Sequence, residues 1–168
     1  EVFKFEINEQ HKTIKQGSVV TIDYKDKHIQ SILDLTDVDI HKISSKGFRV
    51  VVDGINSSGG VYVPYLLKKL GIEVIEINCD ANGKFAHNPE PLPDNLSQLA
   101  STVIDNQADF GIAVDPDVDR LVLVCEDGSF FGEENTIVVI AKYILQNYPG
   151  NSVVSNLSTT RAVQDIAQ

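Results

Sequence analysis

The chain has 168 residues, enough for one domain with its own core, and its 42% hydrophobic and 23% charged content is that of a soluble globular protein. A net charge of −10, from 24 acidic and 14 basic residues, argues against nucleic acid or an anionic membrane as the main partner. No apolar run reaches the roughly 18 residues that span a bilayer, and no signal-peptide pattern opens the chain. The two cysteines make no disulfide framework, so we expect a reducing, cytoplasmic location.

The two ends of the chain differ from its middle. There is no methionine, so the chain is either processed or an internal piece of a longer one. We favour the second interpretation because the chain opens without a cap or turn signal and stops within a helical pattern. Residues 1–21 lack periodicity and are predicted to be a linker or the tail of a preceding domain. Residues 150–168 are predicted to begin a following domain, which leaves 22–149 as one α/β domain.

Apolar spacing in the first half predicts helices and strands in alternation. A helix is expected over residues 24–35 and a buried strand over 48–53. A glycine-rich loop, 54–60, leads into the next helix, and Pro64 is predicted to mark the first turn of that helix, where proline is tolerated. A second strand over 73–77 would complete a βαβ unit with a parallel strand pair.

The second half continues the alternation after a loop over 80–93 that is rich in proline, asparagine and glycine. The elements expected are a helix over 96–104, strands over 110–114 and 121–125, a short edge strand at 129–131 and a well-buried helix over 133–147. Together the elements predict an α/β fold of three layers, with a mostly parallel sheet of about four strands flanked by helices.

The most informative segment is Asp115-Pro116-Asp117-Val118-Asp119-Arg120, which follows a predicted strand. Its three carboxylates repel one another, at a cost of about 4 kcal/mol per pair for charges about 4 Å apart at an effective dielectric near 20. A hard divalent cation with oxygen ligands relieves that repulsion, and open α/β sheets bind ligands at the carboxyl ends of their strands. We therefore expect a metal at Asp115, Asp117 and Asp119; the competing interpretation is a solvated acidic turn.

Arg120 has two interpretations of its own. It balances the three acidic charges, or it holds a phosphate that shares the metal, an arrangement suited to phosphoryl transfer. A calcium loop of the EF-hand type is rejected, although Glu126 falls at the twelfth position. The sixth position is Arg120 rather than glycine, and strands rather than helices flank the loop.

Two further segments give weaker signals. Residues 53–60 join a strand to a helix N-terminus, where an anion can bind, but they match no standard phosphate-binding motif, so a structural turn is the better interpretation. His87 lies in the segment 87–91, which contains two prolines and forms a rigid loop. A lone histidine in a loop is usually structural or solvated.

Taken together, these residues resemble the α-D-phosphohexomutases, the family of phosphoglucomutase, phosphomannomutase and phosphoglucosamine mutase. Residues 115–120 fit that family's Asp-Gly/Pro-Asp-x-Asp-Arg metal loop, and 108–113, 53–60 and 85–91 look like its other segments in order and spacing. The departures are Val118, where alanine or glycine is common, and the spacing of the glycine loop.

The resemblance implies the second domain of a four-domain enzyme. By it, Asp115, Asp117 and Asp119 would bind Mg²⁺, and Arg120 would contact the phosphoryl group or orient the metal loop. A phosphoserine would pass its phosphoryl group to a hexose or hexosamine 1- or 6-phosphate and recover one from the bisphosphate intermediate. The family's Ser-His-Asn-Pro, sugar-reading and phosphate-gripping loops are absent from this sequence, so these residues alone are expected to be inactive and to need the remaining domains of the polypeptide as partners.

Two other interpretations remain. One is a non-catalytic α/β module that binds a metal or a nucleotide sugar. The other, a phosphatase of the haloacid-dehalogenase type, fits worse, because that chemistry needs the first aspartate as nucleophile and a downstream lysine, whereas a third aspartate and an arginine follow here.

Overall fold

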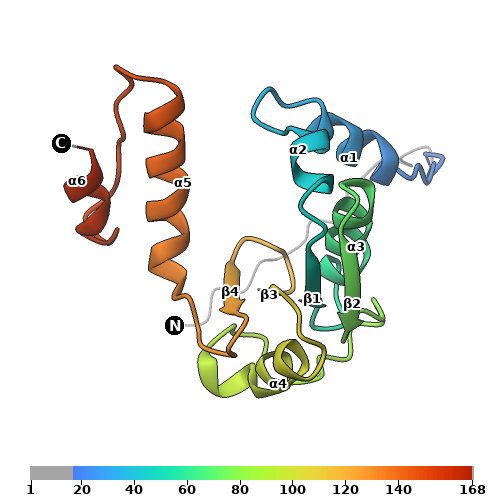
Figure 1. The fold of residues 1–168 in the computed structure, drawn as a ribbon. Helices are drawn as coiled ribbons and strands as arrows, with labels where there is room; N and C mark the ends of the chain where they lie inside the picture. Colours follow the sequence, from blue (N-terminus) through green and yellow to red (C-terminus); the bar gives the residue numbers. More distant parts are fainter. Residues whose placement is uncertain (1–16, 168) are drawn as a thin grey trace, which may run out of the picture.

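The computed structural model describes residues 17–167, and a four-stranded sheet lies at its centre (Figure 1). The strands are β1 (Arg49–Asp53), β2 (Glu73–Ile77), β3 (Phe110–Val114) and β4 (Leu121–Cys125), in the order β2-β1-β3-β4. β1 runs parallel to both β2 and β3, whereas β4 is antiparallel to β3. The predicted mostly parallel sheet is therefore confirmed, with its one antiparallel strand at an edge.

Helices cover both faces of the sheet, which confirms the three layers. Alternate residues of a strand point to opposite faces. Val50 and Val52 therefore pack with Leu67 of α3 (Gly59–Lys69), whereas Val51 packs with Leu99 of α4 (Ser97–Asp105). The three valines are fully buried. This double burial explains why β1 is a continuous apolar run rather than an alternating one.

The remaining helices lie outside this core. They are α1 (Lys25–Leu33), α2 (Ile40–Ser44), the short 3₁₀ helix η1 (Pro93–Asn95), α5 (Glu133–Asn147) and α6 (Ala162–Ile166). Of these, α6 packs against α5 rather than against the sheet. The helix α2 was not predicted, because five residues are too few to show a helical period; Asp39 caps it by accepting a hydrogen bond from the Lys42 backbone N–H at 2.9 Å. Within residues 17–167, no helix is both long and apolar enough to cross a membrane.

The position predicted for Pro64 is wrong. The helix α3 begins at Gly59, so Pro64 is its sixth residue and lies inside it. The early start depends on two glycines that let the first turn approach the sheet. A Cβ on Gly59 would lie 2.3 Å from Cγ2 of Val114, and one on Gly60 would lie 2.6 Å from Cα of Cys79. Proline contributes no N–H to the helix, so α3 lacks one hydrogen bond at this point.

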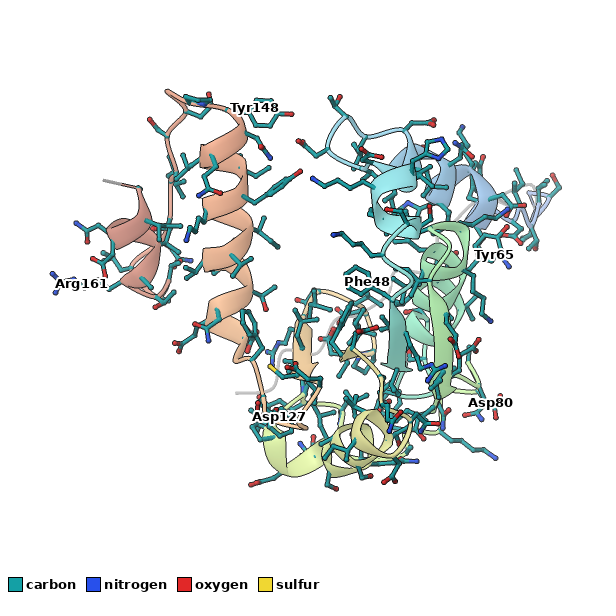
Figure 2. The ribbon with its side chains drawn as sticks, viewed as in Figure 1. Phe48, Tyr65, Asp80, Asp127, Tyr148 and Arg161 are labelled. Carbon is teal, nitrogen blue, oxygen red and sulfur yellow. The ribbon has the colours of Figure 1, made fainter. Side chains whose placement is uncertain are left out.

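Two expectations about the C-terminal half are also corrected. The helix α5 is not well buried: only Ala141 is buried, and Ile137, Val139 and Ile140 are each about half exposed. Its apolar side faces a groove of about 330 Å³ beside β4. Tyr148 follows the last residue of the helix (Figure 2), and its hydroxyl group donates a hydrogen bond to Asp37 at 2.8 Å. Instead of an edge strand at 129–131, the chain forms a single bridge between Phe130 and Val124.

We expect Gly60→Ala to lower the free energy of unfolding by about 2 kcal/mol, because the new methyl group would overlap the Cys79 backbone and overpacking costs about 1–3 kcal/mol. Urea denaturation measures the change. Gly17→Ala is the matched control, since a Cβ on Gly17 meets nothing within 4 Å. Equal stability of the two variants would contradict the close approach.

Candidate metal centre

The candidate centre lies where β3 ends. The backbones of β1 and β3 are paired in parallel, with Asp53 opposite Ala113. Asp115 follows two residues later, so two acidic residues lie at the same edge of the sheet, and both are buried. This edge is where open α/β sheets place their ligands.

Asp115, Asp117 and Asp119 come together as predicted. Each offers one carboxylate oxygen, and these three oxygens lie within 4.8 Å of one another; Asp115 is buried and the other two are exposed. Two oxygens bound to one Mg²⁺ lie at most about 4.2 Å apart, since each Mg–O bond is about 2.1 Å. The exposed side chains therefore need only a small movement to share an ion, and three carboxylates are the hard ligands that Mg²⁺ prefers.

Three hydrogen bonds, two from the glycine-rich loop and one within the acidic loop itself, fix the shape of this acidic loop. The hydroxyl groups of Ser57 and Ser58 both donate to the carbonyl oxygen of Pro116, at 2.8 Å each. The backbone N–H of Arg120 donates to Oδ1 of Asp115 at 3.1 Å. The glycine-rich loop, for which a structural turn was the favoured interpretation, thus supports the acidic loop directly through its two serines.

The acidic groups influence one another's ionisation. Burial favours the neutral form of Asp115, but the backbone N–H of Arg120 and hydrogen bonds from Asp119 and Asp117 outweigh it and lower the pKa of Asp115. The pKa of Asp119 is raised, because its side chain hydrogen-bonds to Asp115 and lies beside the charges of Asp115 and Asp117. Full ionisation of the cluster is therefore unfavourable without a cation, which is the repulsion that the sequence predicts.

The backbone of Arg120 belongs to the acidic loop, and its side chain extends toward the 87–91 segment. Its Nη1 lies 3.4 Å from Oε1 of Glu90, and both side chains are about half exposed. An ion pair of this length and exposure contributes little to stability. The guanidinium is therefore available to an anion that binds beside the three aspartates.

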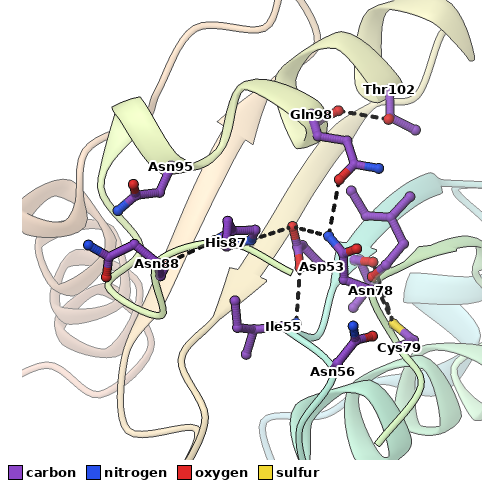
Figure 3. A network of polar contacts seen from close by, with 12 residues as sticks. Asp53, Ile55, Asn56, Asn78, Cys79, His87, Asn88, Asn95, Gln98 and Thr102 are labelled. Atoms are coloured by element: carbon purple, nitrogen blue, oxygen red, sulfur yellow. Dashed lines mark hydrogen bonds and ion pairs between the residues drawn. The ribbon is translucent and has the colours of Figure 1, made fainter. Parts of the chain in front are cut away.

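A second buried carboxylate, Asp53, forms a polar network that the sequence did not reveal (Figure 3). Its oxygens accept hydrogen bonds from the backbone N–H of Ile55 at 3.0 Å, from Nδ2 of Asn78 at 3.1 Å and from Nε2 of His87 at 3.1 Å. His87 is thus no free loop histidine. The sequence offered one signal for this network: Asp53 is the last residue of a predicted strand. Asp115 likewise follows the end of a strand, so both residues lie at the same edge of the sheet.

Cys79 lies beneath the glycine-rich loop, beside Asp53. Its thiol donates to the carbonyl oxygen of Ile77 at 3.2 Å, and a Cβ on Gly54 would lie 3.2 Å from its sulfur. Burial raises the pKa of this thiol from 9.0 to about 11, and the charges of Glu76 and Asp53 add to the effect. The thiol therefore stays protonated at neutral pH and fills space rather than acting as a nucleophile.

Comparison with known proteins assigns this fold and site to a family. The family described as phosphoglucomutase/phosphomannomutase, alpha/beta/alpha domain II, matches residues 26–128, which is more than half of the chain. The chain belongs to this family. The resemblance noted in the sequence is thereby confirmed, including the assignment to the second domain.

Curated relatives carry three related names. A probable phosphoglucosamine mutase of Methanopyrus kandleri is 34% identical over 84% of the chain, and a phosphoglucomutase/phosphomannomutase of Thermococcus kodakarensis is 37% identical over 78%. A phosphomannomutase/phosphoglucomutase of Pseudomonas putida is 32% identical over 93%. The aligned region makes up 30%, 29% and 33% of these relatives, so the chain spans about a third of their length.

Solved structures agree in fold. A phosphoglucomutase/phosphomannomutase family protein of Burkholderia thailandensis matches 86% of this chain and 32% of its own, with a TM-score of 0.73 and 28% identity. A putative phosphomannomutase of Thermus thermophilus matches 89% of this chain and 35% of its own, with a TM-score of 0.78 and 23% identity, a likeness that shows the fold alone.

We expect Val118→Asn to raise the free energy of unfolding by about 1 kcal/mol. Val118 has a φ of +63°, a left-handed conformation that costs a β-branched residue about 1–2 kcal/mol and that asparagine tolerates. Its side chain is 40% exposed, so little buried area is lost. Chemical denaturation tests this, with Val118→Ala as the control that keeps a strained Cβ. A less stable Val118→Asn protein would show that the valine side chain matters more than the backbone strain.

We expect the Cys79 thiol to react about 100-fold more slowly with iodoacetamide in the folded protein than in the unfolded protein at pH 8, because its pKa is about two units higher. Mass spectrometry of the Cys79 peptide measures the rate. The unfolded chain releases this proton at lower pH than the folded one, so the folded state should also lose stability between pH 9 and about 11. Equal folded and unfolded rates would contradict the raised pKa.

Proposed function

We propose that this chain is the metal-binding domain of an enzyme that interconverts the 1- and 6-phosphates of a hexose or hexosamine. The observation that carries the proposal is the cluster of Asp115, Asp117 and Asp119, with Arg120 next to it, at the ligand-binding edge of a phosphoglucomutase/phosphomannomutase domain II. Phosphoryl transfer relies mainly on positioning and on charge neutralisation, which these groups are suited to supply.

In this proposal the residues have separate roles. Asp115, Asp117 and Asp119 would hold Mg²⁺, which when bound supplies Lewis acidity and neutralises phosphoryl charge. Arg120 would bind the oxygens of the transferring group through its planar fork of N–H donors. The hydrogen bonds from Ser57 and Ser58 to Pro116 would keep the acidic loop in shape as charge develops beside it.

The rest of the reaction would need residues outside this chain. We propose that a phosphoserine in another domain of the same polypeptide donates the phosphoryl group and that a sugar bisphosphate is the intermediate. On this basis residues 22–149 would be the metal-binding domain, 1–21 a linker or the tail of a preceding domain, and 150–168 the start of the next domain, in a cytoplasmic enzyme. Residues 1–16 lie outside the part of the chain that the structure describes. The chain alone would then bind metal without turning over substrate.

The names of the relatives supply the candidate sugars for this class. The relatives are named for glucosamine, glucose and mannose phosphates, and each is about one-third identical to the chain. A direct assay of the complete protein with the 1-phosphates of glucose, mannose and glucosamine would identify it. If none of the three is converted, the alternative of a non-catalytic module that binds a metal or a nucleotide sugar is favoured.

We expect Asp117→Asn to lower mutase activity in the complete protein by at least tenfold, because one of three metal-binding charges is lost. Product formation with the preferred sugar phosphate at fixed Mg²⁺ measures this. Asp105→Asn, an exposed position on α4, removes the same charge away from the cluster and should leave activity unchanged. Full activity of Asp117→Asn would remove this residue from the mechanism.

We expect the 168-residue chain to bind Mg²⁺ weakly, because three carboxylates leave the other positions of the octahedron to water. Isothermal titration calorimetry measures the affinity, and Asp117→Asn should weaken it about tenfold. A submicromolar Kd would show that further ligands exist within the chain.

A further inference from the structure

The Asp53 network continues from the sheet edge to Arg120. Nδ1 of His87 lies 2.8 Å from the carbonyl oxygen of Asn88, and Oδ1 of Asn88 accepts a hydrogen bond from the backbone N–H of Glu90 at 3.2 Å. The carboxylate of Glu90 then reaches the guanidinium of Arg120. The path begins at Asp53, at the end of β1, where Figure 3 shows its contact with His87 and the contact of His87 with Asn88, and it ends at the candidate metal centre beyond β3.

We propose that His87 and Glu90 are positioning residues for Arg120. In this inference, which rests on the proposed function, the contact between His87 and Asp53 fixes the place of Glu90. Glu90 then holds the guanidinium of Arg120 beside the acidic loop until a phosphoryl group replaces it.

The first step of the path is strong because Asp53 is almost completely buried. Its side chain is 1% exposed and that of His87 is 18% exposed. A buried carboxylate that loses a partner is costly, so the ring of His87 is held firmly in place. Both ring nitrogens lie within hydrogen-bond distance of an oxygen atom, so the ring is oriented from two sides.

The second step depends on the stiffness of the segment after His87. Proline has a fixed φ, and Pro89 and Pro91 lie on either side of Glu90. Asn95 adds a further restraint, because its Nδ2 donates to the carbonyl oxygen of Glu90 at 2.8 Å. A segment anchored at His87 and restricted in this way gives the Glu90 side chain a defined origin.

The third step is weak, as exchange with a substrate requires. The Glu90–Arg120 contact measures 3.4 Å, and its side chains are 53% and 47% exposed, so the pair contributes little by itself. A phosphoryl group carries more charge than a carboxylate and binds the arginine fork bidentately. It therefore replaces Glu90 without a large penalty, and the guanidinium is already oriented when the group arrives.

Steady-state kinetics of the complete protein tests the inference. We expect His87→Ala to lower kcat about tenfold with KM within about twofold, because misplacement of a group that contacts the transferring phosphoryl affects the transition state most. His87→Gln, whose side-chain amide can still donate to Asp53, should recover most of the loss. Asn82→Ala removes a hydrogen bond from the same loop outside the path and should match the wild type. A kcat of His87→Ala within twofold of wild type would overturn the inference.

A double-mutant cycle separates positioning from a general structural role. If His87 acts through Arg120, then His87→Ala should lower kcat less than twofold further in an Arg120→Ala background. A full tenfold further loss there would mean that His87 acts elsewhere, and the inference would fail.

A spectroscopic readout keeps the inference separate from the proposed function. The Nε–H resonance of Arg120 in ¹⁵N-labelled complete protein, assigned with Arg120→Lys, should shift in His87→Ala and in Glu90→Gln but not in Asn82→Ala. An unchanged resonance in the first two variants would overturn the positioning path. This measurement needs no turnover, so it tests the positioning of Arg120 even in a protein that converts no sugar phosphate. Such a protein would refute the proposed function, and the resonance would still decide the positioning inference.

Discussion

The parallel pairing of β1 and β3 is the constraint on which the candidate centre depends. It brings Asp53 and Asp115 to one edge of the sheet, where both are buried. Buried carboxylates need hydrogen-bond donors, and the two acids obtain them differently. Asp53 is satisfied by Ile55, Asn78 and His87, so it anchors structure. Asp115 accepts from the backbone of Arg120 and lies beside two more carboxylates, so it remains open to a cation.

Much of the fold could be predicted from the sequence. The strands β2, β3 and β4 have the predicted bounds, because short apolar runs between turn signals are typical of buried strands. Helix α2 and the start of α3 could not be predicted. The first is too short for a period, and the second depends on the contacts of Gly59 and Gly60 with residues elsewhere in the chain. The burial of α5 was overestimated, because an apolar helix sequence does not show whether other parts of the chain pack against the helix.

Only the part of the candidate site whose residues are close together in the sequence could be predicted. Three carboxylates within five residues predict a cation site from the sequence alone, and the three side chains do lie together. The Asp53–His87 contact joins residues 34 apart, and the Arg120–Glu90 contact joins residues 30 apart. Neither leaves a periodic or compositional trace. Val118 is an intermediate case: its departure from the family's alanine or glycine was visible in the sequence, but its left-handed backbone was not.

The packing of Gly54, Gly60 and Cys79 has a consequence for how this domain can change over generations. A Cβ on Gly54 would lie 2.4 Å from Cα of Gly60, and one on Gly60 would lie 2.6 Å from Cα of Cys79. Both contacts are with backbone atoms, so a side chain at Gly54 or Gly60 requires the backbone itself to move, and no exchange of the neighbouring side chains relieves the overlap. The loop whose serines support the acidic residues therefore tolerates little change at its two glycines.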